Sequence, residues 1–201
     1  MTQFIETLCI EDGRPKHLAY HLNRMIRTSQ HFHGVRIPLH PLFEHIAVTK
    51  SCGRAKLRIL YDTHILSIDE TPYTPLYRHT VRLVTADSLL YNYKYADRTA
   101  IDQIWHKAGT DDIIIVQHDQ ITDSAIANLV FENSHGLFTP IHPLLAGTCR
   151  QRLLNQGIIR EAVISRQTLS QYDRVYFINA LCPLYSLPAF PVNMFLKDGQ
   201  E

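Results

Sequence analysis

Residues 4–25 read FIETLCIEDGRPKHLAYHLNRM, and this stretch predicts how the fold begins. The apolar run FIETLCI predicts a strand, and Gly13 in the following EDGR predicts a tight turn into a returning strand at PKHL. From Leu18 to about His33 the apolar residues recur at helical spacing, and Gly34 follows where a C-cap glycine belongs. We therefore expect a hairpin followed directly by a long helix.

The rest of the first half continues this α/β pattern. Residues 41–50 predict a second helix, and the stretches AKLRILYD and HILSIDE, separated by a short polar break, predict paired strands. The segment TPYTPLYRH then holds two prolines and little periodicity, which is typical of a linker. We place a domain boundary there, between a first domain at 1–75 and a second at 76–201.

The second half alternates strands and helices. TVRLVTA predicts a strand, DRTAIDQIWHKAG a helix that ends at Gly109, and DDIIIVQ a buried strand. ANLVFEN and GLFTP predict a hairpin around SHG, and GTCRQRLLNQG predicts a helix that begins at its Gly-Thr step. A strand, a short helix near SQYD and the strand RVYFIN follow. The sequence therefore predicts a mixed α/β protein of the α+β class, built in two parts.

Composition excludes several functional classes. The chain has 201 residues, of which 45% are hydrophobic and 19% charged, and its formal net charge is +1. Because basic and acidic residues are mixed along it, we expect neither nucleic acid nor a membrane surface as a partner. No basic, apolar leader opens the chain, and no apolar run approaches the roughly 20 residues that span a bilayer. Four scattered cysteines form no C-x-x-C pair, so we expect reduced thiols and a cytoplasmic protein.

Four short stretches carry the functional signal: HLNRM (21–25), YKYADR (93–98), ITDSAIANLVF (121–131) and LLAGTCRQRLL (144–154). Taken singly, each has an ordinary structural interpretation, such as a solvated arginine, a surface lysine, a turn aspartate or a helix start. Their order and spacing together resemble the class IV aminotransferase family of pyridoxal-phosphate enzymes, over most of the chain from FIETLCI to INALCPL. The resemblance implies a small N-terminal α/β sandwich, a C-terminal barrel-like α/β domain, pyridoxal 5'-phosphate as cofactor and a homodimer.

The resemblance assigns cofactor roles to named residues. The arginine of H-L-x-R-[LM], here Arg24, binds the cofactor phosphate, a task that suits the guanidinium fork. Lys94 takes the place of the catalytic lysine that holds the cofactor as a Schiff base. In GTCR, Thr148 and Cys149 supply backbone N–H groups at a helix N-terminus. Asp123 stands where the family has a glutamate that pairs with the pyridine nitrogen, and it is shorter by one methylene.

The same resemblance separates branches of the family. Aminotransferases tend to carry a tyrosine five residues after the lysine, but position 99 is Thr, and Arg98 completes the K-x-x-x-R of aminodeoxychorismate lyases. INALCPL resembles the lyase stretch N-A-L-x-P, which places Asn179 and Ala180 near the phosphate or substrate carboxylate. We therefore favour a PLP-dependent 4-amino-4-deoxychorismate lyase that forms 4-aminobenzoate for folate biosynthesis. A small class IV aminotransferase and an inactive relative remain the alternatives.

A metal centre competes only weakly with this interpretation. His17 and His21 are four residues apart, and His31 and His33 flank Phe32. No acidic or cysteine partner stands at ligand spacing, so we predict no metal site.

Overall fold

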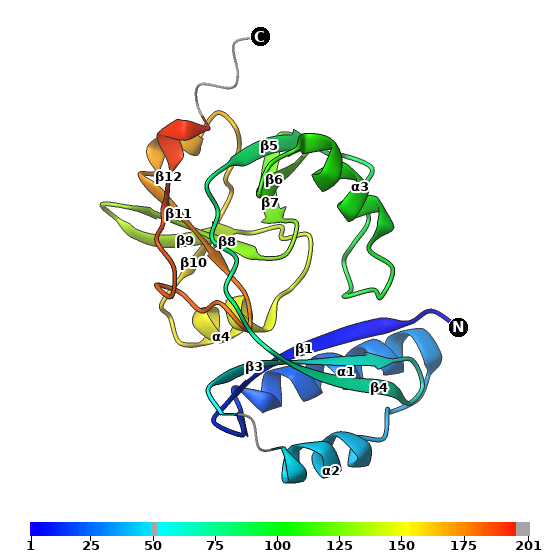
Figure 1. The fold of residues 1–201 in the computed structure, drawn as a ribbon. Helices are drawn as coiled ribbons and strands as arrows, with labels where there is room; N and C mark the ends of the chain where they lie inside the picture. The colour runs from blue at the N-terminus through cyan, green and yellow to red at the C-terminus, as the bar shows by residue number, and fades with distance from the viewer. Residues whose placement is uncertain (50–51, 196–201) are drawn as a thin grey trace. The chain divides into compact units, whose positions relative to one another are not determined.

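The computed structural model describes residues 1–49 and 52–195, and the chain forms two compact units (Figure 1). The first unit comprises Met1–Pro75 and Tyr93–Asp97, and the second comprises Leu76–Asn92 and the chain from Arg98 onward. The first change of unit, after Pro75, lies within the predicted linker. We expected Lys94 in the second domain, but the segment 93–97 groups with the first unit because it bonds to that unit's first strand.

The first unit contains one antiparallel sheet. Its strands lie in the order β2-β1-β3-β4. Their bounds are β1 (Phe4–Glu11), β2 (Arg14–Pro15), β3 (Arg54–Tyr61) and β4 (Ile65–Pro72). The central pair is long and regular, with Phe4 opposite Tyr61 and Glu11 opposite Arg54. The predicted opening hairpin and the β3–β4 pair are confirmed, although β2 is only two residues long.

Two helices, α1 (Leu18–His33) and α2 (His40–Val48), pack against this sheet. Alternate residues of each strand face them, because successive side chains of a strand point to opposite faces. Residues 4, 8 and 10 of β1 and residues 55, 57, 59 and 61 of β3 therefore join Met25 and Leu42 in one core. α1 ends at Gly34, whose φ of 69° is left-handed, as the sequence predicts. The predicted end of α2 at Lys50 lies outside the described residues.

The second unit is built on a larger, branched sheet. A path of strands runs β10-β9-β8-β7-β6-β5, and β11 pairs with β8 and with β12. The strand bounds are β5 (Val81–Thr85), β6 (Asp112–Gln117), β7 (Gln120–Ser124), β8 (Asn128–Asn133), β9 (Gly136–Pro140), β10 (Arg160–Ala162), β11 (Arg174–Ile178) and β12 (Phe190–Pro191). The helices are α3 (Thr99–Ala108) and α4 (Thr148–Asn155), with single 3-10 turns η1 (Leu169–Gln171) and η2 (Val192–Met194).

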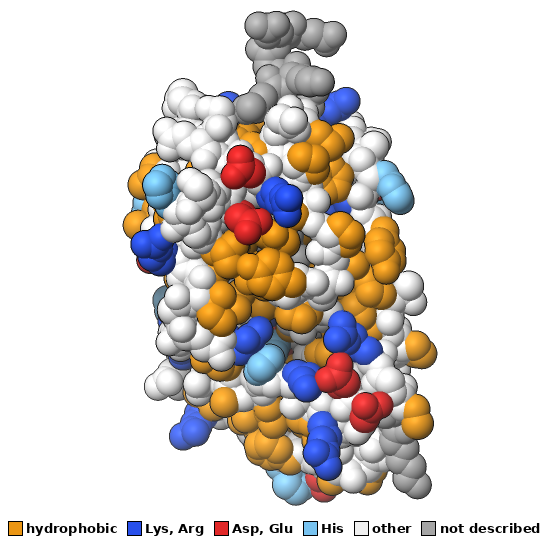
Figure 2. All heavy atoms as spheres, turned by 90° about the vertical axis from the view of Figure 1, so that its left-hand side faces the viewer, with side chains coloured by type: hydrophobic (Ala, Val, Ile, Leu, Met, Phe, Trp, Pro, Cys, Tyr) orange, Lys and Arg blue, Asp and Glu red, His pale blue; other side chains and the backbone are white. Residues whose placement is uncertain are grey.

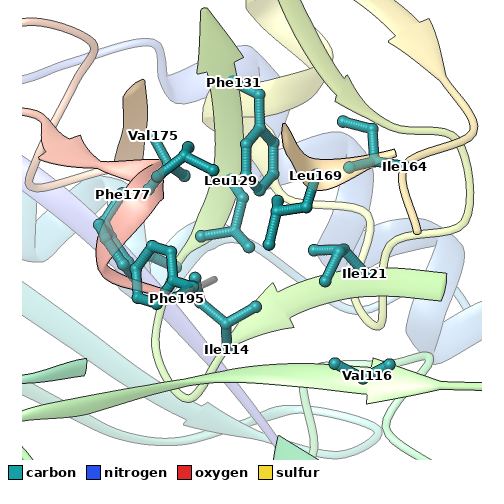
Figure 3. Close-up of a cluster of buried hydrophobic side chains, with 12 residues drawn as sticks. Ile114, Val116, Ile121, Leu129, Phe131, Ile164, Leu169, Val175, Phe177 and Phe195 are labelled. Atoms are coloured by element: carbon teal, nitrogen blue, oxygen red, sulfur yellow. The ribbon is translucent and has the colours of Figure 1, made fainter. Parts of the chain in front are cut away.

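The core of the second unit lies where these strands curl around a cluster of aliphatic and aromatic side chains (Figure 3). Ile114 and Val116 come from β6, and Leu129 and Phe131 come from β8. The sheet is mixed: α3 connects the parallel strands β5 and β6, whereas β6 to β9 are antiparallel neighbours. This confirms the mixed α/β class. The sequence did not predict β7, β12 or η2 as separate elements.

No helix within residues 1–49 and 52–195 is both long and apolar enough to cross a membrane.

Candidate active site

A buried glutamate on β1 organises the candidate site residues of the first unit. Glu6 lies on the strand face that looks toward α1, between Phe4 and Leu8, and none of its surface is exposed. His21 and Arg24 are three residues apart and therefore share one face of α1. Arg24 Nε donates to Glu6 Oε2 at 2.9 Å, and His21 Nδ1 lies 2.9 Å from Glu6 Oε1. Arg24 Nη2 binds Oε1 as well, so the guanidinium grips the carboxylate with two nitrogens.

The charge of this cluster is fixed. Burial on its own raises the pKa of the Glu6 carboxyl, but the Arg24 charge and the His21 hydrogen bond outweigh burial and hold that pKa well below its usual range. Glu6 is therefore a permanent anion that orients Arg24. The Arg24 side chain keeps 16% of its surface exposed.

Lys94 is fixed to the edge of the same strand. The Ile5 N–H donates to the Lys94 carbonyl at 2.9 Å, the Ala96 N–H donates to the Gln3 carbonyl at 2.9 Å, and Phe4 and Tyr95 form an antiparallel bridge. The segment 93–97 is thus held to the start of β1 by an isolated bridge and the two backbone bonds beside it. Sequence periodicity did not indicate this pairing.

Two tyrosines anchor the lysine segment. Tyr93 stacks on His31 with a centroid distance of 5.2 Å, and Tyr95 packs against Phe4 at 5.4 Å. Both rings join the core of the first unit. The Tyr95 N–H donates to the Tyr93 carbonyl at 2.9 Å, so the backbone makes a tight turn centred on Lys94. The motif YKY therefore attaches the backbone around Lys94 to the first unit through its two tyrosines.

A second buried carboxylate, Asp123, lies in the second unit at the end of β7. Asn128 Nδ2 donates to its Oδ1 and the Leu145 N–H donates to its Oδ2, both at 2.8 Å. Burial raises the pKa of this carboxyl to about 7, because these neutral donors compensate only partly for lost hydration. Asp123 can therefore exchange a proton near neutral pH, or can become fully ionised beside a cationic partner.

Asn128 connects Asp123 to the start of α4. Its Nδ2 also donates to the Leu145 carbonyl, and its Oδ1 lies so close to Gly147 that a Cβ built there would be 1.9 Å away. Only glycine fits this N-cap position, which explains the glycine of the GTCR motif. The predicted start of the helix is confirmed.

The first turn of α4 offers donors for an anion. Its leading N–H groups have no acceptor within the helix. The buried Thr148 hydroxyl makes no hydrogen bond to another described residue. The Cys149 side chain is buried, and the Leu184 backbone hydrogen-bonds its thiol, so Cys149 can contribute only its backbone to a ligand.

The loop after β11 adds one more donor. Ile178 pairs with Asn128 across β8 and β11, which brings the following residues to the region around Asn128. The Asn179 Oδ1 accepts from the N–H groups of Leu181 and Cys182, at 2.9 and 2.8 Å, and so forms the turn. The half-buried Ala180 N–H donates to no described residue. Asn179 thus shapes the loop, and Ala180 offers the available N–H.

The predicted site residues gather in two groups. Arg24 and Lys94 belong to the first unit, whereas Asp123, Thr148, Cys149, Asn179 and Ala180 surround Asn128 in the second. The donors of both groups suit a phosphate, and the Asp123 carboxylate suits a protonated ring nitrogen. Among the residues with described positions, no three His, Cys, Asp or Glu side chains gather as metal ligands.

Sequence reasoning assigned no role to Glu6, His21, Asn128 or Gly147. A signal for Glu6 was present, because a charged residue occupies an inward position between apolar neighbours in a strand of period two. Arg98, the arginine of the K-x-x-x-R pattern, donates to the Ala125 carbonyl at 2.9 Å and lies over the Tyr91 ring.

Comparison with known proteins places this arrangement among relatives. The model of the amino-transferase class IV family matches residues 3–189. An uncharacterized protein of Haemophilus influenzae is 31% identical over 185 residues, which are 90% of this chain and 98% of that protein. The crystal structure of a protein of Haemophilus somnus, provisionally named 4-amino-4-deoxychorismate lyase, is 30% identical with a TM-score of 0.82 and covers 92% of this chain and 98% of its own. The PLP-bound form of a hypothetical aminotransferase from Mycobacterium tuberculosis, 17% identical, has a TM-score of 0.70 over 96% of this chain and 85% of its own.

Proposed function

The chain belongs to the class IV amino-transferase family, and from this premise we propose that it is a pyridoxal-phosphate-dependent 4-amino-4-deoxychorismate lyase. The reaction would release pyruvate from 4-amino-4-deoxychorismate and leave 4-aminobenzoate for folate synthesis. The name of the Haemophilus somnus protein, to which the chain is 30% identical, supports this choice.

One observation carries the cofactor part of the proposal: the donors that the second unit gathers around Asn128 match the needs of this cofactor. The first turn of α4 and the Ala180 N–H would receive its phosphate, together with Arg24. Asp123 would pair with its ring nitrogen, and Lys94 would hold it covalently. When bound, the cofactor supplies an electron sink for the carbon that carries the substrate amine.

Lys94 performs the proton transfers in this proposal. Once the substrate amine has taken its place on the cofactor, the freed Lys94 amine would remove the proton from the ring carbon that bears the substrate nitrogen. The electron pair left there becomes a ring double bond while the bond between the ring and the enolpyruvyl oxygen breaks. The oxygen leaves with the bonding pair as the enolate of pyruvate, which takes that proton at its methylene carbon and becomes pyruvate, so the lysine returns to its starting state. Aromatisation of the ring drives this step, and a lyase therefore tolerates the shorter Asp123 in place of glutamate.

The preference for a lyase rather than an aminotransferase rests on local sequence features. Thr99, which begins α3, replaces the tyrosine that aminotransferases tend to carry, and residues 179–183 follow the lyase pattern.

The test measures products directly. Purified protein is incubated with 4-amino-4-deoxychorismate, and 4-aminobenzoate and pyruvate are quantified in parallel with amino-donor assays containing 2-oxoglutarate. We expect equal amounts of the two products and no transamination. Lys94→Ala should lose turnover and the borohydride-fixable cofactor, whereas Lys107→Ala, on the exposed side of α3, should retain both. Transamination without lyase products would favour the aminotransferase alternative, and absence of bound cofactor would favour an inactive relative.

We extend the proposal to a cytoplasmic homodimer. Class IV active sites lie at a subunit interface, and all four cysteines are free thiols, as expected in a reducing compartment. Light scattering at micromolar concentration tests the dimer, and a monomer would contradict it.

A further inference from the structure

The second unit contains a cavity that none of the proposed cofactor residues lines. Its volume is about 290 Å³, and its walls come from residues 77–79 and from stretches between 176 and 194. Figure 2 looks onto the side of the protein where β11 and β12 lie in Figure 1, and hydrophobic side chains gather there among basic and acidic ones. The cavity is of the size that small ligands occupy.

A fixed guanidinium lines this cavity. Arg78 lies over the Phe177 ring, 4.4 Å from its centroid, and its Nε donates to the buried Asp112 carboxylate at 2.6 Å. Its Nη1 reaches the Leu76 carbonyl at 3.4 Å. Its Nη2 makes no hydrogen bond within the described part of the chain. Because the Phe177 ring, the Asp112 carboxylate and the Leu76 carbonyl all fix the guanidinium, the two N–H bonds of Nη2 have a fixed direction.

Aromatic rings form the opposite walls. Tyr185 is 62% exposed, and its φ of 66° is left-handed, a conformation that costs a bulky residue about 1 kcal/mol or more. Its ring packs edge-on against Tyr176 at 5.2 Å, and Tyr77 is also largely exposed. The fold thus keeps Tyr185 in a strained backbone conformation, and this residue contributes an exposed ring to the cavity lining.

The charges around the cavity favour an anion. Arg78 and His79 are the charged or ionisable basic residues of its lining, and no aspartate or glutamate belongs to the lining. The nearby acids are already engaged: Asp112 with Arg78, Asp111 with the N–H groups of His79 and Thr80, and Glu132 with the hydroxyl of the lining residue Tyr176. A cation would therefore find no counter-charge in the cavity, whereas a carboxylate would meet Arg78 Nη2.

We propose that this cavity binds a small aromatic carboxylate, with its ring against the tyrosine and phenylalanine walls and its carboxylate on Arg78. The proposal does not depend on the lyase activity, because the cavity shares no residue with the proposed cofactor site. The pairing combines a flat apolar body with one charge-assisted hydrogen bond.

Three probes of similar size separate the two features of such a ligand. Benzoate has the ring and the charge, benzamide lacks the charge, and cyclohexanecarboxylate lacks the flat ring. We expect benzoate to bind the purified holoenzyme with a Kd of about 1 mM in ligand-observed NMR, as suits so small a molecule. The other two should bind at least about tenfold more weakly. The proposal would be overturned if all three probes bind equally. It would also be overturned if benzoate shows no binding at about 20 mM, which is roughly 20-fold the expected Kd.

Variants locate the binding. Tyr185→Gly removes the ring from a backbone position that glycine adopts without strain, and Arg78→Lys keeps a cation beside Asp112 while removing Nη2. Each should weaken benzoate binding about tenfold or more. Leu90→Ala, at an exposed position of the same unit that does not line the cavity, is the control and should leave the Kd unchanged.

Two results would contradict the assignment. If both cavity variants keep the parent Kd and the parent circular dichroism spectrum, benzoate binds elsewhere, for example at the cofactor site. The second result is that the dimeric protein does not bind benzoate whereas a monomeric variant does. In that case a second copy of the chain covers the cavity. Neither result affects the lyase assay, so failure here is distinguishable from failure of the proposed function.

Discussion

Glu6 in the first unit and Asp123 in the second are both carboxylates with almost no exposed surface, yet their surroundings give them opposite charge behaviour. Arg24 and His21 bind Glu6, so its pKa is held low and it stays ionised. Burial raises the pKa of Asp123 to about 7, because its N–H donors are neutral and only partly offset the lost hydration. The comparison teaches that burial does not decide the charge of a carboxylate. The charge of its hydrogen-bond partners decides it.

The difference also separates two functions. Glu6 already has its counter-ion and therefore acts as a support that aims Arg24. Asp123 has no cation bonded to it within the described residues, which is the state expected of a carboxylate that waits for a cationic ligand. The same substitution, carboxylate to amide, should therefore have unlike effects at the two positions.

Glu6→Gln should give the largest effect on stability. It leaves the Arg24 guanidinium largely buried without an anion, and breaking such a pair costs about 3–5 kcal/mol of unfolding free energy. Urea unfolding at pH 7 measures this loss. Glu11→Gln is the matched control on the same strand, because Glu11 also pairs with an arginine but is partly exposed, and it should cost far less. Equal losses for the two variants would mean that burial of the Glu6 pair is unimportant.

Asp123→Asn should affect turnover more than stability. Turnover should fall about a hundredfold while borohydride-fixable cofactor stays bound, since the amide cannot supply the negative charge at the ring nitrogen. The unfolding free energy at pH 8 should change by less than about 1.5 kcal/mol, because removing a buried charge offsets one imperfect hydrogen bond. Unchanged turnover would show that the carboxylate does not serve the cofactor.

Gly147→Ala tests the support around Asp123. The new Cβ would overlap Asn128 Oδ1, so the asparagine must move, and we expect a loss of about 2 kcal/mol with weaker cofactor retention. Gly34→Ala is the control for backbone conformation, because its left-handed φ is unfavourable for alanine but no atom lies within 4 Å of the new Cβ. The control should lose about 1 kcal/mol and retain the cofactor.

A gradual effect should appear in the pH dependence of the cofactor-free protein. Between pH 4 and 7, folded Asp123 holds a proton that the unfolded chain releases, so stability falls as the pH rises, by at most about 1.4 kcal/mol per pH unit. Glu6 contributes in the opposite sense, and its contribution is lost only as the pH falls below about 4.5. Subtracting the stability–pH profile of Asp123→Asn from that of the parent protein isolates the contribution of Asp123. A flat difference between pH 5 and 7 would mean that Asp123 has an ordinary pKa.

Local signals were sufficient for many elements of the fold. The helix that ends at Gly34, the helix that ends at Gly109 and the start of α4 at Thr148 are confirmed, because caps and periodicity are written in neighbouring residues. The strand β7 was missed because the turn before it lacks such a local signal. His118 and Asp119 form its turn with both φ angles positive, without the glycine that usually signals such a turn.

Tertiary pairing was the part that the sequence could not reveal. The bonds between Lys94 and Ile5 join segments far apart in the chain, and periodicity carries no information about such a partner. The contact of Glu6 with Arg24 also depends on how α1 lies on β1. The family resemblance supplied the residues of the candidate site, but it did not indicate what holds them.

The segment 93–97 has a practical consequence for dividing the protein. A gene fragment that ends at residue 75 would encode every strand and helix of the first unit, but it would lack the backbone that covers the edge of β1 at residues 3–5. Exposed strand edges recruit other chains, so such a fragment should self-associate on expression. Grafting YKYAD onto it through a flexible Gly-Ser tether would restore the missing edge and give a self-contained module for biophysical work.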